Sequence, residues 1–297
     1  MSRRTAGLLA GIAAYGSWGV IPIYFKAVSA APPLELLAHR VVWALVLLVV
    51  LLKRQGRLAE FHAALRPGRT LAMLAASTVL IAVNWLVYIW AVVGDRVLEG
   101  SLGYFINPLV NVVLGVLVLK EKLERPVMVA VAVAALGVAW LTLSVGHPPW
   151  VSLTLAASFG SYGLLRKLAP VGAVVGLAVE TLLLLPLALG YLAWAHGRGS
   201  LTFLAGDLGL DTLLVLAGPA TAIPLLLFTA AARRLPLSTL GFIQYLSPTL
   251  QFLLAVFLWG EPLGRERAVA FGCIWAGLLI FTVHSLRRGV AEPLTEG

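Results

Sequence analysis

Long apolar runs separated by short polar segments dominate the pattern of this chain. Each run is close to the roughly 20 residues that a helix needs to cross about 30 Å of hydrocarbon. Most runs are apolar around the whole helix, and period-2 alternation typical of a membrane β-strand is absent. The pattern predicts an all-α membrane protein with ten transmembrane helices. They are expected at Ala6–Val28, Leu36–Leu52, Thr70–Val93, Leu98–Leu119, Val127–Val145, Trp150–Leu165, Val171–Ala193, Thr212–Ala232, Ser238–Trp259 and Ala268–Leu286.

The composition indicates that lipid, and not water, surrounds most of the chain. Of 297 residues, 60% are hydrophobic and only 12% are charged, and the mean hydropathy is +0.96. Soluble proteins carry roughly a quarter charged residues, which is more than this chain has. The net charge of +9 would suggest nucleic-acid binding in a soluble protein. In a membrane protein it is attributed to basic cytoplasmic loops, so no nucleic-acid partner is expected.

The distribution of Lys and Arg predicts the orientation. With the N-terminus inside, the cytoplasmic segments hold sixteen basic residues and the outer loops hold four. This bias predicts a multi-pass protein of a bacterial inner membrane with both termini in the cytoplasm. The first run has a second interpretation as a signal peptide, with Val28-Ser29-Ala30 as the cleavage site. Its apolar run is longer than the roughly 7–15 residues of a signal-peptide core, which favours a transmembrane helix.

The two halves of the chain share motifs at a spacing of 140 residues. Pro248 lies 140 residues after Pro108, and Glu261 lies 140 residues after Glu121. A repeat of this length holds five spans, and because five is odd, the second copy must enter the membrane in the opposite orientation. Inverted repeats with a site at their interface are common in secondary transporters. The expected units are a first repeat at 6–145, a second at 150–286 and a short cytoplasmic tail at 287–297.

Several segments resemble a known transporter family. The Pro and Glu-Leu motifs of the fourth and ninth spans, Asn107-Pro108 with Glu121-Lys122-Leu123 and Ser247-Pro248 with Glu261-Pro262-Leu263, resemble the EamA module of the drug/metabolite transporter superfamily, present twice. Other segments resemble its RarD subgroup, which is named for chloramphenicol sensitivity. These are Ala38-His39-Arg40-Val41-Val42-Trp43, Asn84-Trp85, Ser101 to Asn111, Val179-Glu180-Thr181 and Leu237 to Phe242.

The resemblance implies a ten-helix bundle with a central cavity that transports small organic molecules, usually outward. The first module departs from the family pattern, because Lys120-Glu121 stands where the family usually has Gly-Glu, as in Gly260-Glu261. No phosphate-binding loop is present for ATP, and no metal, cofactor or nucleophile–base motif is visible. The expected function is a secondary transporter without enzyme activity or cofactor. A small-solute channel and a membrane-embedded enzyme acting on lipid remain the alternatives.

Two ionisable residues inside predicted spans are candidates for the substrate cavity. Arg40 lies in the second span and Glu180 lies 140 residues later, in the seventh. Charges within hydrocarbon are costly and are a functional hypothesis by default. In one interpretation both face the cavity, and Glu180 takes up a proton that couples transport to a proton gradient. In the other they form a buried structural ion pair.

Amide and aromatic side chains are the remaining cavity candidates. The proline positions Pro108 and Pro248 predict breaks or kinks in equivalent helices, which point to a transporter site. Interhelical hydrogen bonds are the alternative role for the amides, while the rings suit flat or amphipathic organic substrates. The candidates are Trp18, Asn84, Trp85, Tyr88, Tyr104, Asn107, Asn111, Gln244, Tyr245 and Gln251.

Glu121 and Glu261 end the repeated helices on opposite membrane faces. They are candidates for gating ion pairs, one on each side, with helix capping as the alternative. The sequence leaves monomer and homodimer, the substrate, the coupling ion and the direction of transport open.

Overall fold

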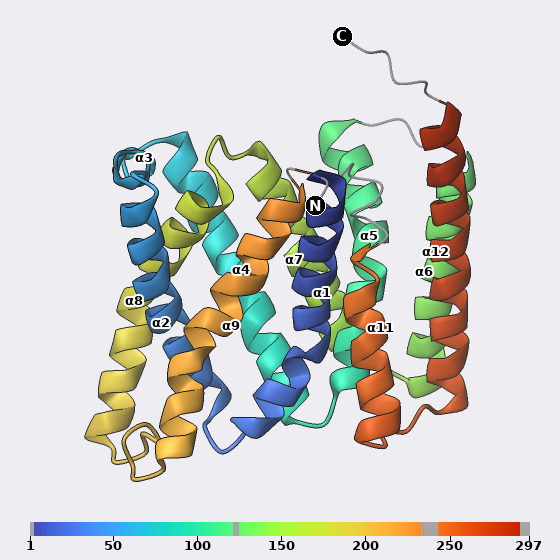
Figure 1. Ribbon diagram of the computed structural model, residues 1–297. Helices are drawn as coiled ribbons and strands as arrows, with labels where there is room; N and C mark the ends of the chain where they lie inside the picture. The colour runs from blue at the N-terminus through green and yellow to red at the C-terminus, as the bar shows by residue number, and fades with distance from the viewer. Residues whose placement is uncertain (1–2, 121–124, 233, 235–242, 292–297) are drawn as a thin grey trace.

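The computed structural model describes residues 3–120, 125–232, 234 and 243–291, and all regular elements within these ranges are helical. Figure 1 shows them as a bundle in which α1 begins and α12 ends on the same side. The elements are α1 (Arg3–Ala27), α2 (Pro33–Arg54), α3 (Leu58–Ala64), α4 (Arg69–Val93), α5 (Val97–Leu119), α6 (Arg125–Val145), α7 (Trp150–Leu168), α8 (Ala173–Gly197), α9 (Leu208–Ala232), α11 (Leu246–Leu253), the π-helix η1 (Leu254–Leu258) and α12 (Arg265–Ala291).

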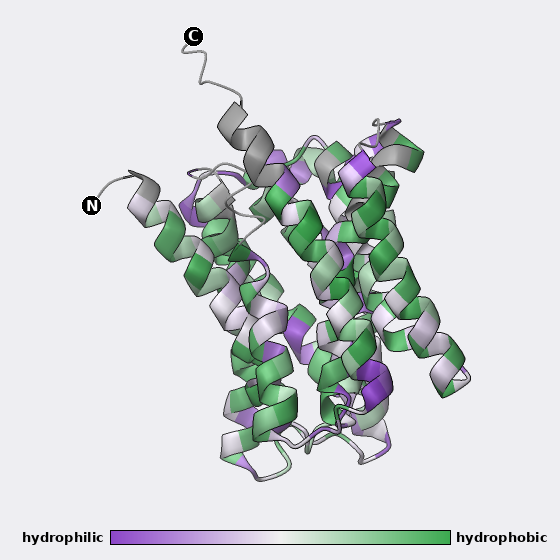
Figure 2. Cartoon of the chain, turned by 90° about the vertical axis from the view of Figure 1, so that its right-hand side faces the viewer, coloured by the Kyte–Doolittle hydropathy of each residue, from purple (hydrophilic) through white to green (hydrophobic). Residues whose placement is uncertain are grey.

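The helices have the length and surface of a membrane protein. Seven within the described residues are long and apolar enough to cross a membrane, namely α1, α2, α4, α6, α8, α9 and α12. Apolar side chains face outward, with Leu143, Leu187 and Phe257 exposed by 82%, 73% and 77%. Figure 2 shows hydrophobic residues along the sides of the helices, with many hydrophilic residues towards the two ends. An all-α membrane protein is therefore confirmed, whereas ten spans in two inverted repeats stay a prediction.

The helix ends follow from local sequence. Pro33 is the first residue of α2. A backbone N–H at this position would have no acceptor within the helix, so proline, which lacks it, costs no hydrogen bond. Gly94 is the C-cap of α4, and Asp95 then adopts a positive φ of 56° that turns the chain towards α5. The short helix α3 lies between α2 and α4, in a segment that the apolar pattern leaves as a loop.

Proline does not break α5, so a break at Pro108 is wrong, whereas a kink there stays a prediction. The helix runs from Val97 to Leu119 with Pro108 inside it. Neighbouring helices can satisfy the backbone groups that proline frees in a membrane helix. Pro248 lies in the first turn of α11, where the backbone N–H that proline lacks would have no helical acceptor.

Helices of the first half pack mainly against helices of the second half. α6 lies along α12, α5 along α7 and α11, α2 between α8 and α9, and α1 along α9 and α11 (Figure 1). A Cβ added at Gly218 of α9 would lie 2.5 Å from the carbonyl oxygen of Trp43 on α2. One added at Gly277 of α12 would lie 2.6 Å from the carbonyl oxygen of Ala130 on α6. Glycine thus allows backbones of the two halves to approach closely.

Candidate functional site

Arg40 of α2 lies where four helices meet. Its Nε donates a 2.7 Å hydrogen bond to the Thr221 hydroxyl of α9. Its guanidinium carbon lies 4.2 Å from the ring centre of Trp85 on α4 and 5.7 Å from that of Phe25 on α1. Among the described residues, no carboxylate lies within 4.0 Å of this half-buried side chain. A cation at this depth without an anion is a functional candidate.

Aromatic and amide side chains continue the site beside Arg40. Tyr88 and Tyr104 are close enough to Arg40 to interact with it electrostatically, and their ring centres are 5.3 Å apart. The Tyr104 hydroxyl donates a 3.2 Å hydrogen bond to Asn84 Oδ1. Asn84 Nδ2 in turn donates to a backbone carbonyl and a serine hydroxyl of α7, each at 3.1 Å. The structure therefore brings Arg40, Asn84, Trp85, Tyr88 and Tyr104 into one group.

A second group lies between α1 and α11. Gln251 Nε2 donates hydrogen bonds of 3.1 Å to the Trp18 carbonyl oxygen and 3.2 Å to the Ser247 hydroxyl. The Trp18 ring is packed 5.3 Å from that of Tyr15 and 6.0 Å from that of Phe228 on α9, measured between ring centres. Gln251 thus makes the interhelical hydrogen bonds of the alternative interpretation and also lies beside an aromatic cluster.

Four candidate side chains carry buried polar atoms with no hydrogen-bond partner among the described residues. They are the Tyr88 hydroxyl, Asn107 Oδ1, the Tyr245 hydroxyl and Gln251 Oε1. Leaving such an atom unpaired costs about 1–3 kcal/mol, and each case calls for a physical reason. A bound polar molecule, or a second arrangement of the helices, would supply the missing partners.

Glu180 of α8 is fully buried, but its partner is Arg166 and not Arg40. The Glu180 carboxylate lies 3.7 Å from Arg166 Nε on α7. It also accepts hydrogen bonds of 2.5 Å from the Ser77 hydroxyl and 3.2 Å from the Tyr162 hydroxyl. The alternative in which Glu180 pairs with Arg40 is therefore wrong, because α7 places Arg166 beside Glu180 while Arg40 faces α4 and α9.

Glu261 caps another helix. It follows η1, and its two carboxylate oxygens accept hydrogen bonds of 2.7 Å and 2.9 Å from the backbone N–H groups of Val97 and Leu98 at the start of α5. Burial raises the pKa of the Glu261 carboxyl, and these two donors act in the opposite direction. Capping, the alternative interpretation for Glu261, is thus observed.

Cationic contacts join other elements at the same end of the bundle. Lys26 at the end of α1 forms an ion pair with Asp95 in the turn between α4 and α5. The ammonium of Lys26 also lies 5.3 Å from the ring centre of Trp259, next to Glu261. Lys26 thereby links α1 both to the start of α5 and to the end of η1.

Sequence reasoning missed Glu35, which holds the loop between α8 and α9. Glu35 is fully buried in the first turn of α2. It accepts hydrogen bonds from the Thr202 N–H and hydroxyl at 2.9 Å and 2.8 Å, and from the Phe203 N–H at 2.9 Å. Only its position beside an apolar run could have suggested burial. The loop, which its glycines suggest to be flexible, is therefore anchored.

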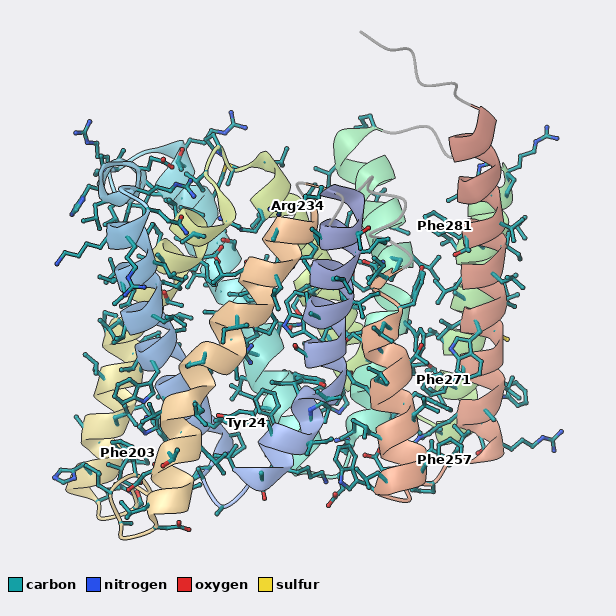
Figure 3. The ribbon with its side chains drawn as sticks, viewed as in Figure 1. Tyr24, Phe203, Arg234, Phe257, Phe271 and Phe281 are labelled. Carbon is teal, nitrogen blue, oxygen red and sulfur yellow. The ribbon has the colours of Figure 1, made fainter. Side chains whose placement is uncertain are left out.

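Sequence reasoning also missed Thr221, Phe25 and Tyr24 around Arg40. Tyr24 of α1 points towards α9, where its hydroxyl donates a 2.8 Å hydrogen bond to the Leu213 carbonyl oxygen (Figure 3). The only sequence signal for Thr221 is a hydroxyl between Pro219 and Pro224 in an apolar helix. The contacts themselves depend on which helices pack together, which the sequence does not display.

The remaining candidates lie beside or within segments that the structure does not fully describe. Gln244 and Tyr245 are half-buried directly before α11, beside the residues 235–242 that are not described. Asn111 lies in α5, but its side chain is outside the described residues, as is Glu121 altogether.

Comparisons with known proteins agree with this arrangement of helices. Residues 5–143 match the EamA-like transporter family. An "Uncharacterized transporter" of Vibrio cholerae is 46% identical over 96% of this chain and 94% of its own. "Protein RarD" of Escherichia coli is 44% identical over 94% of this chain and 95% of its own. A crystal structure of a chain 18% identical covers 94% of this chain and 98% of its own with a TM-score of 0.58, which shows a shared fold.

Proposed function

Because this chain belongs to the EamA-like transporter family, and to its RarD-like members, we propose that it is a secondary carrier of small organic molecules. The carrier works by alternating access between its two halves. The observation that carries this proposal is the Arg40 group. In it a half-buried charge, aromatic rings and a hydroxyl without a partner among the described residues meet between helices of both halves. Such a mixture of polar and aromatic groups suits a small organic ligand.

The packing of the helices supports two inverted repeats at 6–145 and 150–286. The repeat would exchange α1 with α7, α2 with α8, α4 with α9, α5 with α11 and α6 with α12. Under this exchange the α5–α7 packing becomes α11–α1, α4–α7 becomes α9–α1, and α2–α9 becomes α8–α4. The pairs α6–α12, α2–α8 and α5–α11 map onto themselves. All these pairs occur, as an internal two-fold relation requires.

The location of the termini supports the proposed topology. α1 begins and α12 ends on one side of the bundle, as an even number of crossings requires (Figure 1). The excess of Lys and Arg assigns that side to the cytoplasm of a bacterial inner membrane. In this orientation Lys26, Asp95 and Glu261 lie at the outer face, so their contacts close that face and are candidates for an outer gate.

Transport is proposed to run outward, and the cavity is proposed to include the remaining candidates. A relative in Pseudomonas aeruginosa, 34% identical to this chain, carries the name "Chloramphenicol-sensitive protein RarD", so phenicol drugs are reasonable first test compounds. The Asn107, Gln251 and Trp18 side chains would line the same path further along α5, α11 and α1. Glu180, buried on α8, is the proposed proton site.

Counterflow in proteoliposomes tests the carrier. Metabolites enriched in the medium of producing cells would be loaded into vesicles that contain the purified protein. A carrier accelerates uptake of labelled compound when the same unlabelled compound is inside. Uptake without this trans-stimulation would indicate a channel, and conversion of the compound or of lipid in detergent would indicate an enzyme.

A further inference from the structure

We propose that the Arg40 group binds the carboxylate of a small organic anion that also carries a flat apolar part. This inference rests on the proposed carrier function and narrows its substrate class. The guanidinium of Arg40 is hydrogen-bonded through one of its three nitrogens among the described residues. Nε is occupied by Thr221, whereas no hydrogen bond from Nη1 or Nη2 to a described residue is present. The terminal pair of nitrogens presents a planar fork, which matches the two oxygens of a carboxylate.

Arg40 differs from the other described cations that lie near the helix interior. Arg166 lies 3.7 Å from the Glu180 carboxylate, and Lys26 is paired with Asp95. Arg40 has no carboxylate within 4.0 Å in the described residues. Because a charge in a membrane protein is almost always paired or functional, the missing anion is assigned to the transported molecule.

The aromatic rings around Arg40 restrict how a ligand can approach. The Trp85 ring lies 4.2 Å from the guanidinium carbon and covers the cation, with Phe25 at 5.7 Å. A ligand must therefore approach the free edge of the guanidinium. Next to the guanidinium, Phe25 and Tyr88 have ring centres 5.9 Å apart, and the Tyr88 hydroxyl lacks a partner among the described residues. The two rings and the hydroxyl suit a flat apolar group that carries one polar atom.

The depth of Arg40 fits a binding site and not an interfacial contact. Arg40 is seven residues beyond Pro33, the first residue of α2. At the helical rise of 1.5 Å per residue, it lies about 10 Å along the helix from its end. A shorter distance would let the side chain reach the headgroups instead.

The first test measures the charge of the exported compounds. Medium from cells that produce wild-type, Arg40→Gln, Arg40→Lys or Arg198→Gln protein is compared by mass spectrometry with medium from cells that lack it. Arg198 is an exposed control that also lies over a ring, 4.9 Å from the Trp194 ring centre. We expect wild-type protein and Arg198→Gln to enrich carboxylates, and Arg40→Gln to lose about tenfold or more of that enrichment. Arg40→Lys should retain part of it, because charge remains without the fork.

The second test measures binding by the purified full chain in lipid nanodiscs. The probes are phenylacetate, phenylacetamide and 2-phenylethylamine, which share a ring and differ in charge, and the signal is tryptophan fluorescence. A saturable response to phenylacetate alone, present in Arg198→Gln and absent in Arg40→Gln, supports the proposal. No response to phenylacetate, or an equal response to the amide or amine, would overturn it. A structural role of Arg40 would change stability but not this charge preference.

The two proposals fail in different ways. Export and counterflow of neutral or cationic compounds, unaffected by Arg40→Gln, would overturn the anion site and leave the carrier intact. Binding of phenylacetate without export or counterflow would support the anion site and overturn the carrier.

Discussion

At the residue scale, Arg40 and Glu180, which the proposed repeat would place at equivalent positions, have different surroundings. Arg40 bonds to the hydroxyl of Thr221, and its terminal nitrogens form no hydrogen bond with a described residue. Glu180 bonds to the hydroxyls of Ser77 and Tyr162 and is also paired with Arg166. The carboxylate is thus fully coordinated by the protein, whereas the guanidinium is not. From this asymmetry we propose substrate binding for Arg40, and structure or proton transfer for Glu180.

Removing the charge of Glu180 separates these two roles. Glu180→Gln leaves Arg166 without its anion, so we expect the midpoint of thermal unfolding to fall. Adding Arg166→Gln removes the isolated charge and should recover much of that loss. Counterflow driven by a proton gradient is measured on both variants. If Glu180 is the proton site, the double variant regains stability but not proton dependence. Normal proton-driven transport by Glu180→Gln would contradict the coupling role.

Glu261 provides a second residue-scale prediction. Glu261→Ala removes the acceptor for two backbone N–H groups at the start of α5, which should destabilise the protein by about 1–2 kcal/mol. The decrease is measured by thermal unfolding of purified protein in one detergent. Glu60→Gln is the control, because Glu60 lies at the surface and its ion-pair partner among the described residues is Arg57 on the neighbouring turn. An equal effect of the two substitutions would refute the capping role.

At the element scale, apolar length identifies helices that cross the bundle but not the features that depend on neighbours. The runs predict helices such as α4 and α8 to within a few residues. They miss α3, since seven residues at the membrane edge give no transmembrane signal. They also identify Arg40, Trp85, Asn84 and Tyr104 as site candidates, because polar and aromatic groups are rare within such runs. The alternative of Arg40 as the partner of Glu180 is wrong, because the observed partner depends on the Arg166 side chain of α7 reaching α8.

Two glycines should respond to alanine in opposite directions. Gly218→Ala places a methyl group against the Trp43 carbonyl oxygen and should destabilise the α2–α9 contact by about 1–3 kcal/mol. Gly190 lies in α8, and a Cβ added there would have no neighbouring atom within 4 Å. Gly190→Ala should therefore be neutral or stabilise the helix by up to about 1 kcal/mol. Thermal unfolding of both variants checks this, and a stable Gly218→Ala protein would contradict the close contact.

At the scale of the whole molecule, the proposed alternating access requires the outer face to open. The ion pair between Lys26 and Asp95 joins α1 to the α4–α5 turn at the face that the proposed orientation places outside. We expect a short bifunctional maleimide that bridges Lys26→Cys and Asp95→Cys, in a Cys273→Ser background, to abolish counterflow. Each single cysteine variant, treated with the same reagent, is the control and should stay active. Full counterflow in the bridged protein would show that these two elements do not separate during transport.

The interleaving of the two halves also has a consequence for synthesis. The close contact at Gly277 brings α12 against α6. Helix α6 therefore gains this neighbour only after the last helix of the chain has been made. α5 and α2 likewise find their main neighbours in α7 and α8. While the ribosome is still making the second half, lipid must occupy these faces. Final assembly of the first half is therefore a late, largely post-insertion event, and it must expel lipid from surfaces that will later be protein interior.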